Sequence, residues 1–400
     1  MALELTFVPA LLMILVIAGL GRLLSKGLRQ PAIFGELFLG MIFVSFIILT
    51  GLAETGISDI LTDSAEMGIS DMAKIGILLL LFSTGLGTNF EEFKRLEVAS
   101  SVVAISGVIL PFTLGYFATI LFFNDHLIAL FVGVALVATS VGVGASILTE
   151  LRMLRTKIGS LIMGAAVIDD VIGIMLMSAL ISVAITGSIS LAEIFLLIMF
   201  VVLFFLISLT IGIKLCKKLA EKIHIGREDL LLLGLVIVLA FVLISEELGI
   251  TAIIGAFIAG LVVGQTHFAR HLRPHVSLIG GAFFIPIFFV WMGMSFDVSA
   301  FVTVGWFALV LVIVAIVGKV VGCGAGALAA KLGGKESLAV GIAMMPRAGV
   351  ELILVKLGLD HGIIGADIAS AILVMVIITT LITPPSLWKA LKMAKHKKEV

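Results

Sequence analysis

The chain has 400 residues, of which 61% are hydrophobic and 13% are charged, and its formal net charge is zero. A soluble domain carries about 25% charged residues, so this chain has too little polar material for the surface of a soluble enzyme and is too apolar to be disordered. The balanced charge shows no basic excess for nucleic acid, and the two cysteines, Cys216 and Cys323, form neither a disulfide framework nor a metal motif.

Continuous apolar runs predict membrane-spanning helices throughout the chain. The runs do not alternate between apolar and polar residues as a membrane β-barrel would, so the expected fold is an all-α polytopic bundle. The first run has Glu4 rather than a basic segment ahead of it and no clear cleavage site, so we interpret it as a span and not as a secretory signal. In chain order, the thirteen predicted spans are 5–25, 32–53, 72–88, 97–123, 127–149, 157–187, 191–216, 229–247, 250–266, 276–296, 300–331, 336–358 and 364–392.

The distribution of lysine and arginine predicts the orientation of these spans. The odd-numbered connections and the C-terminal tail hold 22 of the 26 basic residues, whereas the opposite side holds only Lys74 and Lys356. Cytoplasmic loops are enriched in basic residues. We therefore expect the N-terminus outside and the C-terminus in the cytoplasm.

Three pairs of motifs indicate an internal repeat. The halves are offset by seven spans, an odd number, so they would cross the membrane in opposite directions, as in the inverted repeats of secondary transporters. The paired segments are Pro31–Gly40 with Thr251–Gly260, Phe82–Phe90 with Val290–Val298 (Gly85 over Gly293), and Ala138–Leu148 with Met345–Leu354 (Gly142 over Gly349).

Charged residues inside the apolar spans are the strongest functional candidates, because a charge at the bilayer centre costs at least about 2.5–3.5 kcal/mol on insertion scales. Asp169, Lys319, Arg347 and the polar Ser140 each lie 12 residues from a basic residue at the cytoplasmic end of their span. Twelve helical residues span about 18 Å, which is mid-bilayer. The five charged candidates are Asp169, Asp170, Lys319, Arg347 and Glu351.

Two adjacent acids and a lysine at one depth suit the exchange of ions. Asp169 and Asp170 cannot both stay ionised at low cost away from water, so at least one is expected to take up a proton. Lys319 is a plausible partner for either acid and, unlike arginine, a buried lysine is able to lose its proton. Such a trio can trade protons for a hard monovalent cation that prefers oxygen ligands.

Helix-breaking residues lie at the same depth in spans 5 and 12. Gly142 and Pro346 predict that the two spans unwind and cross there, with Thr139 and Ser140 lining the ion site. Hydroxyl bonding to the carbonyl four residues earlier is the alternative for these two side chains. Arg347 and Glu351 are spaced to pair and to neutralise a helix end, and a purely structural ion pair is equally compatible with that spacing.

Two other patterns have weaker implications. His267, His271 and His275 recur in a basic cytoplasmic connection, where a pH sensor is conceivable but a solvated loop is favoured. The run 322–326 mimics a dinucleotide motif, but it lies in an apolar helix with no strand before it, so close helix packing is expected.

Three segments together resemble a known family. ATSVG at 138–142, GAAVIDDVIG at 164–173 and the in-membrane lysine of VGKVVG at 317–322 resemble the monovalent cation:proton antiporter-2 family, and within it the NapA-type prokaryotic sodium/proton antiporters. The resemblance covers nearly the whole chain. The adjacent acids with a matching lysine resemble the electrogenic branch, since the electroneutral branch has Asn-Asp. The chain departs from the family after Arg347, where the acid is Glu351 rather than a residue two positions on.

The resemblance implies a NapA/NhaA-like antiporter fold with inverted repeats and two crossed, broken helices. It implies that Asp170 is the main carrier of cation and proton, that Asp169 pairs with Lys319 when sodium is absent, and that Thr139 lies near the ion. A homodimer is also implied. Residues 1–96 and 229–299 would form the dimerisation scaffold, residues 97–216 and 300–393 the moving core, and residues 217–228 a cytoplasmic linker.

These features predict an electrogenic sodium (or lithium)/proton antiporter of the cell membrane that serves pH homeostasis. Sodium would bind at Asp170, Asp169 and Thr139, in competition with protons, and two protons per sodium are expected if Lys319 also releases one. No cofactor, nucleotide or nucleic acid is expected, and the partners are membrane lipids and a second copy. The alternatives are a potassium/proton antiporter, a sodium-coupled organic-anion symporter and an ion channel, whereas a membrane enzyme would need a nucleophile or metal cluster that the sequence lacks.

Overall fold

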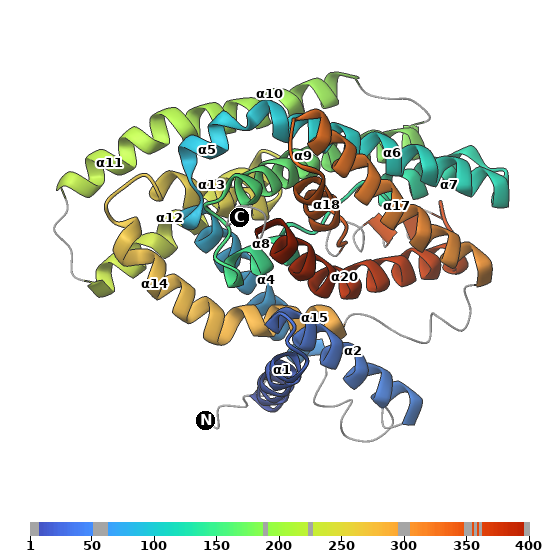
Figure 1. Cartoon of the computed structure of the whole chain (residues 1–400), viewed down its shortest axis with the longest axis horizontal. Helices are drawn as coiled ribbons and strands as arrows, with labels where there is room; N and C mark the ends of the chain where they lie inside the picture. Colours follow the sequence, from blue (N-terminus) through green and yellow to red (C-terminus); the bar gives the residue numbers. More distant parts are fainter. Residues whose placement is uncertain are drawn as a thin grey trace.

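The computed structural model describes residues 8–50, 63–186, 191–222, 227–294, 305–347, 354–355, 358–359 and 362–395. Every regular element in these ranges is helical (Figure 1). Nine of the described helices are long and apolar enough to cross a membrane, and four shorter apolar helices accompany them. The described part of the chain is therefore an apolar helical bundle, as its composition predicts.

The helices of the first half run from α1 to α9. Apolar composition rather than amphipathic patterning defines most of them, as expected where both lipid and protein interior are apolar. They are α1 (Val8–Leu28), α2 (Ala32–Thr50), α4 (Asp63–Gly87), α5 (Phe90–Arg95), α6 (Glu97–Phe123), α7 (His126–Ala135), α8 (Val141–Glu150) and α9 (Lys157–Thr186).

The second half contains two long continuous helices, each with a π-helical segment inside it. The first joins α10, η2 and α11, and the second joins α14, η3 and α15. The helices are α10 (Leu191–Ile207), η2 (Ser208–Gly212), α11 (Ile213–Lys222), α12 (Arg227–Glu247), α13 (Ala252–Val263), α14 (Ala269–Ile279), η3 (Gly280–Phe284), α15 (Ile285–Met294), α17 (Gly305–Ala329), α18 (Gly334–Ala343) and α20 (Ala366–Lys395).

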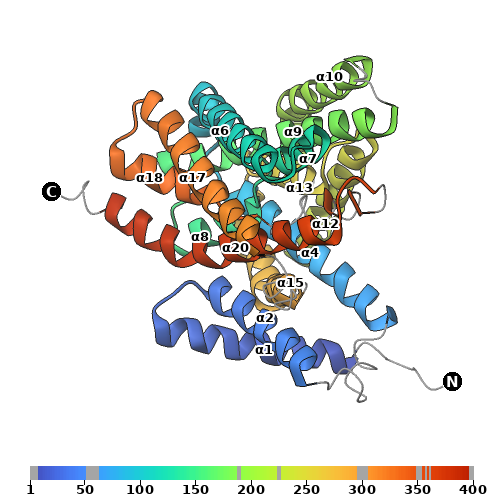
Figure 2. The same cartoon turned by 90° about the vertical axis from the view of Figure 1, so that its right-hand side faces the viewer.

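Two groups of helices lie on either side of α15. Both views show α1 and α2 at one end of the molecule, with α15 between them and the group formed by α6, α17, α18 and α20 (Figures 1 and 2). Within that group, α17 packs against α6, α18 and α20, and α9 packs against α6, α7 and α8. Elsewhere in the bundle, α2 packs against α1 and α15, and α13 packs against α4 and α12.

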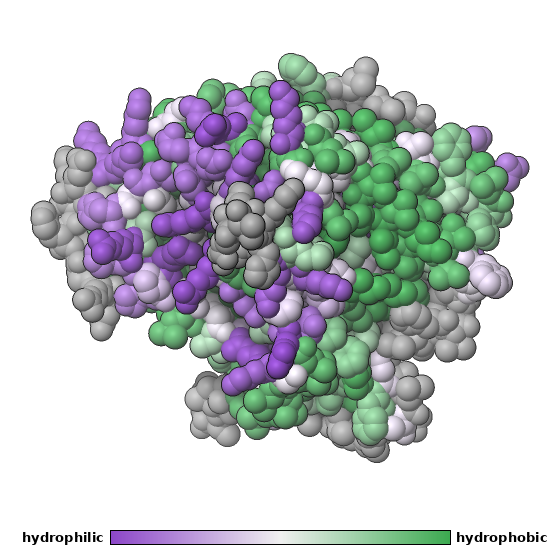
Figure 3. All heavy atoms as spheres, in the orientation of Figure 1, coloured by the Kyte–Doolittle hydropathy of each residue, from purple (hydrophilic) through white to green (hydrophobic). Residues whose placement is uncertain are grey.

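Large apolar side chains are exposed on α6 and α17. Hydrophobic residues cover this side of the molecule, whereas hydrophilic residues gather around α5, α11 and α14 (Figure 3). A soluble monomer rarely exposes an apolar patch of this kind, whereas contact with lipid favours it. The exposed residues include Val98, Val102, Ile105 and Ile109 on α6, and Trp306, Leu309, Ile313, Val317 and Val321 on α17.

Glycine contacts repeat in the two halves of the scaffold helices. Gly40 of α2 and Gly293 of α15 each lie against the backbone of the other helix, and Gly85 of α4 and Gly260 of α13 do the same. In the sequence repeat, Gly40 corresponds to Gly260 and Gly85 corresponds to Gly293. The two helix pairs therefore use equivalent glycines to bring their backbones together, as small residues do in membrane bundles.

Replacing Gly260 with valine is expected to destabilise the protein, because the side chain would collide with the carbonyl oxygen of Phe82 on α4. Overpacking of this kind costs about 1–3 kcal/mol or more. Thermal unfolding of the purified protein would measure the loss. Gly19→Val on α1 is the control, since nothing lies within 4 Å of a side chain added there. Equal melting temperatures for the two variants would contradict this packing.

The histidine connection differs from its prediction. A solvated loop is expected over His267, His271 and His275, but α14 begins at Ala269, so His271 and His275 lie on a helix that continues into α15. Nδ1 of His275 lies 2.7 Å from the carbonyl oxygen of His271, one turn earlier. Hydropathy marks only the apolar part of a span, and this helix begins with polar turns packed through Leu272 and Val276.

Candidate functional site

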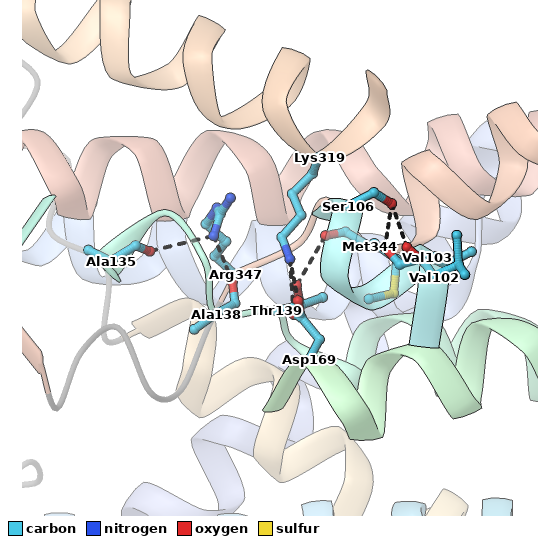
Figure 4. Close-up of polar contacts among 10 residues, drawn as sticks. All are labelled: Val102, Val103, Ser106, Ala135, Ala138, Thr139, Asp169, Lys319, Met344 and Arg347. Carbon is cyan, nitrogen blue, oxygen red and sulfur yellow. Dashed lines mark hydrogen bonds and ion pairs between the residues drawn. The ribbon is translucent and has the colours of Figure 1, made fainter. Parts of the chain in front are cut away.

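A buried ion pair joins α9 to α17. Nζ of Lys319 lies 2.8 Å from Oδ1 and 2.9 Å from Oδ2 of Asp169, and both side chains are 0% exposed (Figure 4). The pair lies in the middle of both helices, far from their polar ends. Gly107 of α6 packs against α17 beside the pair, where an added Cβ would collide with Sγ of Cys323. The two opposite charges compensate each other, which buried ions require.

Asp170 points to a different neighbour. Its carboxylate is 4% exposed, and its Oδ2 atom accepts a hydrogen bond of 2.8 Å from Oγ1 of Thr251, the residue before α13. Adjacent residues of a helix point about 100° apart, so the two acids face separate partners. Lys319 therefore pairs with Asp169, and Asp170 remains as a second buried carboxylate beside that pair.

Sequence analysis missed Thr251 as a member of this site. It was noted only as the first residue of the repeated segment Thr251–Gly260. One available signal is the length of the helix that follows, because α13 has only 12 residues. A helix of that length is about 18 Å long, so its first turn is expected at the depth of the buried charges rather than at the membrane surface.

Span 5 is interrupted at the depth of the acids. Helix α7 ends at Ala135 and α8 begins at Val141, so residues 136–140 are not helical. Thr139 and Ser140 lie in this interruption and are 7% and 8% exposed. The structure thus places both predicted hydroxyls in a buried, non-helical stretch.

This stretch contacts residues that follow α18. The backbone N–H of Ser140 donates to the carbonyl of Pro346 at 2.7 Å, and Oγ1 of Thr139 donates to the carbonyl of Met344 at 3.3 Å. The Thr139 hydroxyl therefore bonds across to a second irregular segment rather than to the carbonyl four residues earlier. Irregular backbone at membrane depth is tolerated only where protein or a water-filled cavity surrounds it, and these contacts meet that condition.

Arg347 reaches the end of α7. Its side chain is 0% exposed, and Nη1 donates to the carbonyls of Ala138 at 2.7 Å and Ala135 at 3.5 Å (Figure 4). The Thr380 hydroxyl of α20 donates to the backbone carbonyl of Arg347. A cation at the C-terminal carbonyls of a helix is stabilised by the helix dipole. Glu351, its predicted partner, lies outside the described residues.

The arrangement suits one exchangeable positive charge. The Asp169–Lys319 pair is neutral as a unit when both groups are charged, so the remaining carboxylate of Asp170 carries the unbalanced negative charge. Either a proton or a hard monovalent cation would neutralise it, and both would use the same oxygen atoms.

Comparisons with known proteins agree with one another. Residues 12–391 match the family model described as "Sodium/hydrogen exchanger, transmembrane". The chain is 33% identical over 386 residues to the Na(+)/H(+)-K(+) antiporter GerN of Bacillus cereus, covering 96% of each protein. It is 33% identical to the high-affinity Na(+)/H(+) antiporter NhaS3 of Synechocystis, covering 97% of this chain and 90% of that protein.

The fold is also similar to a solved structure. The sodium proton antiporter MjNhaP1 of Methanocaldococcus jannaschii superposes with a TM-score of 0.68 at 19% sequence identity. The match covers 96% of this chain and 100% of that one. At this identity the likeness concerns the fold.

Proposed function

Because the chain belongs to the sodium/hydrogen exchanger family of multi-pass membrane antiporters, we propose that it exchanges cytoplasmic sodium or lithium for external protons. The observation that carries this proposal is the buried carboxylate of Asp170 beside the neutral Asp169–Lys319 pair. A sodium ion and a proton neutralise the same charge, so they exclude each other. Alternating exposure of that carboxylate to the two sides would then exchange one ion for the other.

The sodium ligands that we propose are oxygens from α9 and from the non-helical residues 136–140. Asp170 is the main carrier, Asp169 contributes once it leaves Lys319, and Thr139 and Ser140 line the site. Support comes from the burial of all four side chains. It also comes from the hydrogen bond between the Thr139 hydroxyl and the carbonyl of Met344, the residue that follows α18. We propose that spans 5 and 12 are the two crossed, broken helices, with Arg347 neutralising the end of α7 and Glu351 as its further partner.

We further propose a moving core and a fixed scaffold. Residues 97–216 and 300–393 form the core that carries the ion, residues 1–96 and 229–299 form a scaffold that dimerises, and residues 217–228 link them. The packing of α17 with α6, α18 and α20, separate from that of α13 with α4 and α12, supports this division. The equivalent glycine contacts support an inverted repeat, and the basic connections support an N-terminus outside and a C-terminus in the cytoplasm.

Exchange is expected to be electrogenic, with two protons per sodium, as in the NapA-type branch of the antiporter-2 family. Lys319 would release the second proton when Asp169 leaves it and coordinates the sodium ion. In proteoliposomes that contain a pH-sensitive dye, sodium and lithium pulses should drive proton movement across the bilayer, and an imposed membrane potential should change its rate. Empty liposomes are the control. Exchange that ignores the potential would contradict the two-proton proposal while leaving antiport intact.

Potassium/proton exchange is the second candidate. It is favoured by the relative GerN, which is named as a Na(+)/H(+)-K(+) antiporter. Potassium pulses in the same liposomes separate the two candidates. A response to potassium without a response to sodium would overturn the sodium assignment.

A further inference from the structure

The hydrogen bond between Thr251 and Asp170 connects the proposed moving core to the proposed fixed scaffold. Asp170 lies on α9, which packs against α6, α7 and α8, and Thr251 precedes α13, which packs against α4 and α12. Oγ1 of Thr251 donates to Oδ2 of Asp170 at 2.8 Å. A movement of one part against the other must therefore break a bond made by the carrier carboxylate itself.

The Thr251 side chain is committed to this contact. Thr251 is the N-cap residue of α13, with φ −62° and ψ 142°, yet its side chain makes no capping hydrogen bond. A threonine at this position commonly accepts a hydrogen bond from an amide of the first turn. Here the hydroxyl is directed to Asp170 instead. The carboxylate also lies at the N-terminal side of α13, where the positive end of the helix dipole is directed toward it.

The strength of this bond depends on what Asp170 carries. A hydrogen bond to an ionised carboxylate is roughly twice as strong as one to a neutral group. A bound proton or cation neutralises the carboxylate and takes up acceptor positions on the same oxygens. The bond between the two parts is therefore strongest when Asp170 is charged and empty.

An exchanger must prevent the movement of its empty form. If the core returned across the membrane with Asp170 charged and unoccupied, sodium would flow without protons and the coupling would be lost. We propose that Thr251 is a coupling latch: its hydroxyl holds the empty, ionised Asp170 against the scaffold, and a proton or cation on Asp170 releases the core. This inference rests on the proposed function and assigns a role to a residue outside the predicted ion ligands.

The test compares uncoupled sodium flux in three variants of the full chain. Thr251→Val removes the hydroxyl and keeps the shape, whereas Thr251→Ser keeps the hydroxyl. Thr84→Val of α4 is the matched control, since among the described residues that buried hydroxyl bonds only to the carbonyl of Leu80 in its own helix, at 2.7 Å. Efflux of radioactive sodium is followed from proteoliposomes at pH 9 on both sides, where protons are scarce, with thiocyanate as the permeant anion.

Thr251→Val is expected to raise this proton-independent efflux about tenfold and to lower the number of protons moved per sodium. Thr251→Ser and Thr84→Val are expected to match the unmodified protein. Thr251→Ala provides the same comparison if the valine variant does not assemble in the membrane. Tightly coupled exchange in a folded variant without the hydroxyl would overturn the latch. Absence of sodium/proton exchange in the unmodified protein would instead overturn the proposed function, and the latch with it.

Discussion

Replacing Asp170 with asparagine is expected to reduce sodium-driven proton movement to the level of empty liposomes. The amide keeps the shape of the carboxylate, and its oxygen is still able to accept the Thr251 hydrogen bond, which measures 2.8 Å in the native chain. The amide carries no negative charge to attract sodium and takes up no proton near neutral pH, so neither sodium nor a proton is expected to bind there. The pH-sensitive dye assay in proteoliposomes measures the effect, and thermal unfolding verifies that the variant is folded.

The control for this substitution is Asp71→Asn. Asp71 lies on α4 with its side chain 64% exposed and pairs with Lys74 at 2.9 Å. Pairs of this kind contribute little to stability, so full exchange is expected in the control. Exchange at the native rate in a folded Asp170→Asn protein would remove Asp170 from the role of carrier and would leave the Asp169–Lys319 pair as the remaining candidate.

Replacing Lys319 with methionine is expected to lower the free energy of unfolding strongly. Lys319 and Asp169 are both 0% exposed and 2.8 Å apart. Removal of one partner leaves an uncompensated buried charge, which costs about 3–5 kcal/mol. The loss should be greatest at high pH, because at low pH the orphaned Asp169 takes up a proton and becomes neutral. Thermal unfolding of the purified protein over a pH series measures it.

The double variant Asp169→Asn/Lys319→Met tests the same pair without leaving a buried charge. A neutral pair of similar volume is often as stable as a buried ion pair, so the double variant should recover most of the stability lost in Lys319→Met. If Lys319 supplies the second proton, sodium/proton exchange in the double variant should no longer respond to the membrane potential. If the double variant lost as much stability as Asp169→Asn and Lys319→Met lose together, direct coupling between these side chains would be contradicted.

The positions of the long spans follow from hydropathy. The predicted span 97–123 coincides with α6 (Glu97–Phe123), and 157–187 closely matches α9 (Lys157–Thr186). The thickness of the bilayer sets the length of an apolar helix, so these boundaries are local properties of the chain. The polar turns before the apolar part of α15 are not visible to hydropathy, and the helical state of His271 and His275 was missed for that reason.

The depth of the charged residues was also available from the sequence. Counting from the basic ends of the spans places Asp169, Lys319 and Arg347 at one level, because a helix rises by a fixed amount per residue. Such counting gives no direction around the helix axis. It left open whether Lys319 faces Asp169 or Asp170, since both acids lie within a single helical turn.

The sequence by itself determined that this is an all-helical membrane antiporter with two acids and a lysine at one depth. Residue spacing left the contacts open, and the tertiary structure decided that Lys319 pairs with Asp169, as the family resemblance implies. It also decided that Arg347 reaches the carbonyls at the end of α7 and that Asp170 faces Thr251. These contacts join residues far apart in the chain, and the rotation of each helix against its neighbours selects them. Close packing of side chains and glycines fixes that rotation, whereas hydropathy and helical rise leave it undetermined.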